Sequence, residues 1–116
     1  MDAAEALERL RRSPLRAPVR LAVMLLLAAR PKVEFEELRR ALGITPGNLW
    51  SHIEKLREAG LVKLYYRPLL RGGPRLMLEA TDNGVQELLN YLEALRALEE
   101  AAGACKPRLP RCSESP

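Results

Sequence analysis

The chain has 116 residues, enough for one small domain with tails, and its 47% hydrophobic and 29% charged residues are typical of a folded globular protein. Its net charge of +4 is a modest excess, so the placement of the charges matters more than their sum. The longest apolar run, residues 21–29, is shorter than the ~20 residues that span a bilayer, and the acidic N-terminus lacks the basic start of a secretory signal. We therefore expect a cytoplasmic protein with no membrane partner. The low amide content, one Gln and three Asn, suits a heat-adapted source.

Two helices are predicted in the first thirty residues. Apolar residues at helical spacing indicate a short helix over residues 2–12, with Asp2 as its N-cap and a break at residues 13–14. A second helix is expected from Pro18, a favoured first-turn residue, to Ala29. Its run of residues 21–29 is apolar on all sides, which predicts a central place in the core.

Two further helices are separated by a tight turn. The third, over residues 35–42, is expected to end at Gly43 as its C-terminal cap. The fourth begins after Thr45, an N-cap followed by proline at the first helical position, and runs to Ala59. A short helix, a turn and a second helix at this spacing are typical of a helix-turn-helix motif.

The second half of the chain changes period. Apolar and polar residues alternate over residues 61–67 and 75–81, which predicts two strands joined by a glycine-containing turn. A long helix over residues 82–102 follows, with Thr81 as its cap. The fold class is therefore mainly α with a small β-hairpin (α+β), a winged helix-turn-helix. We expect residues 1–14 to form an N-terminal helix or arm, residues 15–102 the winged-helix domain, and residues 103–116 a disordered tail.

The central motif is Phe35-x-x-Leu38, then Leu42-Gly43-x-Thr45-x-Gly47-Asn48-Leu49-x-x-His52-x-x-x-Leu56-x-x-Ala59-Gly60-x-Val62. It resembles the small winged-helix transcriptional regulators related to the MarR and ArsR groups, of the compact single-domain kind found in archaea and bacteria. The resemblance covers residues 17–95 and implies a dimeric, sequence-specific DNA-binding repressor or activator. Two positions depart from the family pattern. Trp50 stands where the family usually has a small polar residue, and Ala80-Thr81 replaces the usual Leu-Thr at the junction of strand and helix.

The fourth helix supplies the predicted base contacts. Its buried stripe leaves a polar face that contains Asn48, Ser51 and Lys55. Asn pairs bidentately with adenine, Ser is adaptable, and Lys reaches guanine or phosphate. Gly47 lets the helix N-terminus approach a phosphate closely. Trp50, on the flank of the helix, is expected either to pack against the adjacent helix or to touch the DNA backbone.

The hairpin carries four basic residues against Glu79 alone, and Arg71 at its tip suits the minor groove. The alternative is an edge hairpin whose charges prevent aggregation. The DNA-binding residues predicted on the two elements are Thr45, Gly47, Asn48, Trp50, Ser51, Lys55, Lys63, Arg67, Arg71 and Arg75.

The last helix carries more apolar surface than one core contact needs, because two adjacent stripes together cover an arc of about 200°. We expect a homodimer through this helix, and the alternative is a monomer in which the N-terminal helix shelters it. The predicted dimer contacts are Leu88, Tyr91, Leu92, Leu95 and Leu98.

Catalysis is not expected, because the sequence has no phosphate-binding loop and no histidine–carboxylate cluster. No metal site or cofactor is predicted, and a small-molecule effector remains open. His52 is expected to be partly buried and bonded to a neighbouring element. Cys105 and Cys112 lie in the tail and leave open a thiol-responsive regulator. The rival function is a winged helix that serves as a protein-interaction module in a larger assembly.

Overall fold

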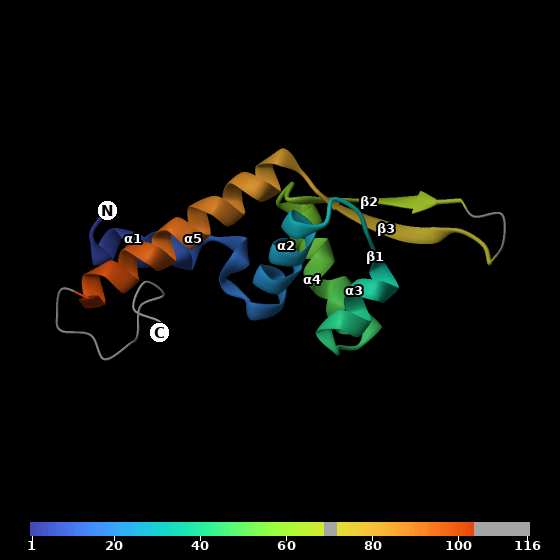
Figure 1. Cartoon of the computed structure of the whole chain (residues 1–116), viewed down its shortest axis with the longest axis horizontal. Coiled ribbons are helices and arrows are strands. Elements are labelled where there is room, and N and C mark those ends of the chain that lie inside the picture. The colour runs from blue at the N-terminus through green and yellow to red at the C-terminus, as the bar shows by residue number, and fades with distance from the viewer. Residues whose placement is uncertain (69–71, 104–116) are drawn as a thin grey trace, which may run out of the picture.

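The structure is a computed structural model that describes residues 1–68 and 72–103 (Figure 1). The expected tail, Arg71 and both cysteines lie outside the described residues. All the predicted helices and both hairpin strands form, with bounds within a residue or two of those expected. The elements in chain order are α1 (Ala3–Arg12), the 3₁₀ helix η1 (Pro14–Arg16), α2 (Pro18–Ala29), β1 (Val33–Glu34), α3 (Phe35–Leu42), α4 (Pro46–Glu58), β2 (Val62–Arg67), β3 (Arg75–Ala80) and α5 (Asp82–Gly103).

The sheet has three antiparallel strands in the order β1-β3-β2, so the hairpin strand β3 is central. Pairing in the hairpin runs from Val62 opposite Ala80 to Arg67 opposite Arg75. The sequence did not predict β1, which adds only Val33 and Glu34 beside β3. Two residues are too few to show an alternating pattern, yet they place Glu34 beside the basic hairpin.

One apolar core joins the helices to the base of the hairpin. Buried residues of α2 meet the buried stripe of α4 and the first turns of α5. α2 takes the expected central place in the core, although its apolar surface is not wholly buried, because Leu25 and Leu26 are exposed on its outer face. The fully buried large side chains are Leu15, Val23, Met24, Leu27, Leu38, Leu49, Ile53, Leu56 and Leu78.

The hairpin leaves this core before it ends. On β2, Val62 is buried and Leu64 is half-buried, whereas Tyr66 on the same face is 68% exposed. The expected half-buried strand is therefore half-buried only at its base, because the inward face of β2 extends beyond the helices that cover it. Figure 1 shows the two strands projecting from the helical body as a wing.

α1 and α5 lie along each other on the side of the body away from the wing (Figure 1). Ala6 and Leu10 of α1 pack with Ala94 of α5 in a small cluster separate from the main core. We call α1 and residues 91–103 of α5 the stalk. The stalk and the wing make the molecule elongated, with principal extents of 58 × 34 × 24 Å.

The junction between the end of α4 and the start of α5 is held by Thr81. Its hydroxyl donates to the carbonyl of Gly60 (2.7 Å) and accepts from the backbone N–H of Gly84 (2.9 Å). Its own N–H donates to the carbonyl of Leu61 (3.0 Å). The predicted cap of the last helix is confirmed, and it also ties that helix to the turn that follows α4.

Candidate DNA-binding interface

The turn between α3 and α4 is fixed from both sides. Gly43 has a φ of 66°, the left-handed conformation that favours glycine, and so ends α3 as predicted. Arg39 of α3 donates to the carbonyl of Ile44 (3.2 Å) and is itself paired with Glu36. At the other end, the Thr45 hydroxyl accepts from the backbone N–H of Asn48 (3.1 Å). These bonds position the first turn of α4 at the surface.

The two faces of α4 divide as the sequence predicts. Leu49, Ile53 and Leu56 are completely buried, whereas Gly47, Asn48, Ser51 and Lys55 are exposed. A Cβ added at Gly47 would have no other atom within 4 Å, so packing gives no reason for a glycine there. These four residues are therefore accessible to a partner at the surface of α4.

Trp50 packs on the adjacent helix, one of the two placements expected for it. Its ring lies edge-on to Phe35 of α3, with centroids 6.1 Å apart, and it remains 44% exposed. The exposed part borders a cleft of about 310 Å³ between α4 and the wing. The side chains that line this cleft are Trp50, Glu54, Arg57, Leu64, Tyr65, Tyr66 and Leu76.

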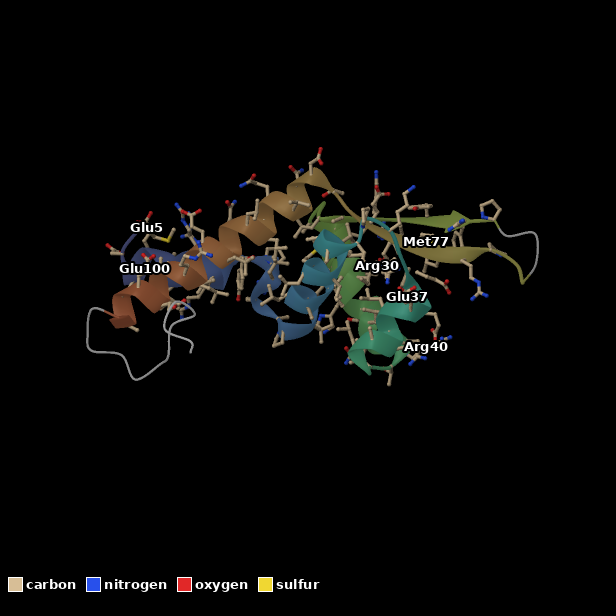
Figure 2. All side chains as sticks on the ribbon, viewed as in Figure 1. Glu5, Arg30, Glu37, Arg40, Met77 and Glu100 are labelled. Carbon is tan, nitrogen blue, oxygen red and sulfur yellow. The ribbon has the colours of Figure 1, made fainter. Side chains whose placement is uncertain are left out.

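Two of the wing's basic side chains have carboxylate partners. Lys63 lies 4.0 Å from Glu79 on the neighbouring strand, and Arg75 donates to Glu34 of β1 at 3.1 Å. Arg67 is exposed opposite Arg75 in the register and has no ion pair with the described residues. Two carboxylates, Glu79 of β3 and Glu34 of β1, therefore offset the positive charge of the hairpin, whereas the sequence indicated Glu79 alone. Close by, Figure 2 shows Arg30 and Glu37 facing each other, and the two form an ion pair.

The five residues predicted as dimer contacts do not share one face of α5. Leu88 is buried in the main core, which removes it from any surface that a second subunit can touch. Tyr91 and Leu98 are half-buried against α1, and Leu92 is half-buried against the main core. Leu95 is exposed, together with Val85 and Leu89, two members of the apolar arc that were not among the predicted contacts.

His52 is half-buried as expected, but the expected hydrogen bond is not found within the part of the chain that the structure describes. Its Nδ1 is buried and has no partner among the described residues, and the same holds for Nε of Arg20 on α2. Burial, together with the positive charges of Arg20 and Lys55, lowers the pKa of His52 below its usual value. The imidazole is therefore neutral in the folded protein at pH 7.

This lowered pKa predicts a pH-dependent stability. Between the folded-state pKa of His52 and its usual value of about 6.5, the unfolded chain binds more protons, so stability is lost as the pH falls through that window. We expect the free energy of unfolding, measured by urea denaturation, to fall from pH 7.5 to pH 5 by at most about 1.4 kcal/mol per pH unit. His52→Gln should flatten this slope. An equally steep slope in His52→Gln would contradict the assignment.

No helix in the described part is long and apolar enough to cross a membrane. Over residues 1–68 and 72–103, histidine and carboxylate side chains nowhere gather in threes as they would around a metal ion. Hollows occur at other places, and one of them, of about 380 Å³, lies where α1 meets α5. Its lining is mostly polar and consists of Arg9, Arg12, Ser13, Glu87, Asn90 and Tyr91.

A helix-turn-helix with an exposed second helix, followed by a basic hairpin, defines the class of winged-helix DNA-binding regulators. Residues 19–98 match the family of winged helix DNA-binding domains. The chain belongs to this family. Fold and family together are those of a DNA-binding regulator, a class that is generally not enzymatic.

Relatives of the chain come from archaea and bacteria. A transcriptional regulator homologue from Pyrococcus horikoshii OT3 is 39% identical, with a TM-score of 0.75 over 83% of this chain and 95% of that one. A transcriptional regulator of the MarR family from Enterococcus faecalis V583 is 28% identical, with a TM-score of 0.64 over 83% and 84% of the two chains. An uncharacterized protein of Methanocaldococcus jannaschii is 29% identical over 82 residues, 71% of this chain and 88% of that protein. The resemblance to MarR-type regulators is confirmed, and homologues occur in thermophilic archaea.

Proposed function

We propose that the protein is a sequence-specific transcriptional regulator that binds duplex DNA with α4 in the major groove. The observation that carries the proposal is the exposed face of α4, where Gly47, Asn48, Ser51 and Lys55 have no packing role in the described fold. A polar helix face of this width fits the major groove, which admits one α-helix. Access to chromosomal DNA places this activity in the cytoplasm.

The side chains of α4 divide into base readers and backbone contacts. We assign Asn48 and Ser51 to base edges, because the amide and hydroxyl groups can donate and accept at once. Lys55 is assigned to phosphate, since a flexible ammonium next to Glu54 discriminates poorly between bases. Gly47 and the Thr45 cap leave the N-terminus of α4 open to a second phosphate.

The wing is assigned to the backbone and the minor groove beside the site read by α4. Arg67 supports this assignment, because its exposed cation is left without a carboxylate partner in the described part of the chain. Lys63 and Arg75 are each paired with a carboxylate of their own. On binding DNA, each would give up this ion pair for a contact with phosphate. Their net contribution should therefore be smaller than that of Arg67. Arg71 remains the sequence-based candidate for the tip.

We further propose that the protein acts as a homodimer through the stalk and the exposed face of α5. Val85, Leu89 and Leu92 fall within about 60° of one another on a helical wheel, on the side opposite Ala94, which packs on α1. Leu89 is 54% exposed, and Leu7 of α1 is exposed as well. An exposed apolar face of this kind, continuous with the stalk, is stabilised when another copy covers it. Two-fold symmetry then predicts an inverted-repeat site with half-sites about one helical turn apart.

Asn48→Ala tests the base-reading role. We expect it to weaken binding to the preferred duplex by roughly 1–3 kcal/mol, about 5- to 150-fold, and to change binding to random duplexes little. The measurement is a salt titration of affinity on both duplexes, after selection of the preferred site from random DNA. Asn90→Ala, the same chemical change on α5, is the matched control and should bind like the wild type.

Two results would contradict these assignments. Equal losses on specific and random duplexes would remove Asn48 from base reading and leave the DNA-binding proposal intact. Wild-type binding that does not weaken as salt rises would contradict DNA binding itself, because phosphate contacts release counterions.

The rival function, a protein-interaction module, draws support from the cleft between α4 and the wing. Trp50 and Tyr66 both line it and both are exposed, which is typical of sites that take a protein partner. The two functions separate in one experiment. The interaction module would be favoured by two results together: the wild type does not bind duplex DNA, and Trp50→Ala loses a protein complex that the wild type forms.

A small-molecule effector has one candidate place beside the stalk. The 380 Å³ hollow between α1 and α5 is of ligand size, and its lining includes both Arg9 and Glu87. An effector seated there would touch the two helices that carry the proposed dimer face. We infer that a small-molecule effector of this protein would bind in this hollow.

A further inference from the structure

Arg20 of α2 is a buried arginine without a partner among the residues that the structure describes. Only 9% of the residue is exposed, and its Nε is buried without a hydrogen bond. The two terminal nitrogens make no hydrogen bond to the described residues and are not fully buried. No carboxylate in the described part of the chain lies within ion-pair distance of it. Burying most of a cation without an anion is unfavourable, and the terminal nitrogens that reach the surface can take an anion from outside the protein.

The position of Arg20 indicates where the anion comes from. α2 packs on α4, and the charge of Arg20 acts on His52 of α4, whose Nδ1 is also buried without a partner among the described residues. Asn48, His52 and Lys55 follow one another at i, i+4 and i+7 and so share one flank of α4. Arg20 therefore lies beside the flank of α4 that also presents Asn48, a proposed base reader, and Lys55, a proposed phosphate contact.

We propose that Arg20 is a phosphate-binding residue: its guanidinium takes a backbone phosphate of the bound DNA at the point where α2 meets α4. The inference rests on the proposed DNA-binding function and adds a contact from outside the helix-turn-helix and the wing. The fork of the guanidinium matches a phosphate bidentately, and its stem is already ordered by burial. A contact of this kind positions α4 in the groove without reading sequence.

Arg20→Met tests the proposal, because methionine keeps a long apolar stem and removes the unpaired charge. Free protein carrying this change should melt at the wild-type temperature or above it. Its affinity for specific and random duplexes should fall alike, by about tenfold or more at low salt. The slope of log affinity against log salt should become less negative by about 0.9 per subunit, the value of one lost phosphate contact.

Arg30→Met is the matched control. It removes the same charge from an exposed ion pair with Glu37, at the opposite end of α2 from Arg20. We expect it to leave both the affinity and the salt slope nearly unchanged. Wild-type affinity in Arg20→Met, or lower affinity with an unchanged salt slope, would overturn the role of Arg20 while leaving the proposed function in place. Absence of wild-type DNA binding would overturn both.

A measurement on the wild type keeps the proposal testable if Arg20→Met does not fold. The assigned Nε–H signal of Arg20 in an NMR spectrum should shift when a specific or a random duplex is added. An unmoved signal at saturation with duplex would overturn the proposal. A shift with inorganic phosphate at matched ionic strength but none with duplex would assign the site to a free anion, and would overturn it as well.

Discussion

Gly84→Ala is expected to unfold the protein or to lower its melting temperature severely. A Cβ at this position would overlap the carbonyl oxygen of Leu61 and lie 2.8 Å from Cε of Met24. Met24 can move, but Leu61 cannot, because its carbonyl accepts the N–H of Thr81 at the junction of α4 and α5. Forcing backbone apart in a packed core costs more than the roughly 1–3 kcal/mol of ordinary overpacking. Thermal unfolding followed by circular dichroism measures the loss.

Gly47→Ala is the matched control, since it makes the same change in another helix. The space around Gly47 is open, so alanine should raise the stability of α4 by roughly 0.5–1 kcal/mol through its higher helix propensity. The two variants should therefore move the melting temperature in opposite directions. A Gly84→Ala protein as stable as the wild type would show that the junction is looser than described.

Leu89→Glu is expected to convert the dimer into a folded monomer. Leu89 is 54% exposed in the single subunit, so a carboxylate there stays in water and leaves the fold intact. In the proposed dimer the same carboxylate would be buried in an apolar seam without a partner, at a cost of several kcal/mol. Sedimentation at tens of micromolar gives the mass, and circular dichroism should show unchanged helix content.

Leu25→Glu provides the control for Leu89→Glu, because Leu25 is also exposed but lies on the outer face of α2. It should remain dimeric. A wild-type monomer at the same concentration would refute the dimer, whereas dissociation of both variants would indicate that the interface includes α2. The monomer should still bind a single half-site, though with much lower affinity than the dimer binds the full site.

Much of the fold follows from strong local signals in the sequence. Asp2, Thr45 and Thr81 cap their helices as predicted, and Gly43 ends α3, because each of these roles depends on a residue's own backbone and side chain. The exposed face of α4 was also predictable, since helical periodicity alone separates it from the buried stripe.

Features set by distant parts of the chain were not predictable in this way. Glu34 faces Arg75 only because β1 pairs with β3, a contact between segments 41 residues apart. Arg20 is likewise a basic residue in an apolar run, and nothing in its neighbours along the chain indicates that it is buried without a partner. Leu88 and Leu89 are adjacent and equally apolar, yet tertiary packing buries one and exposes the other.

The hydrogen bonds of Thr81 also have a mechanical consequence for the proposed dimer. They clamp α5 to the end of α4, so the recognition surface and the 22-residue helix α5 turn as one lever. A helix of this length is about 33 Å long, and tilting it by ~5° displaces its far end by ~3 Å. Successive base pairs are spaced about 3.4 Å apart along DNA. A small rotation of the two subunits about the C-terminal ends of their α5 helices would thus move the start of α5, and the end of α4 bonded to it, by nearly one base-pair step, and Asn48 would change its position against the bases with α4.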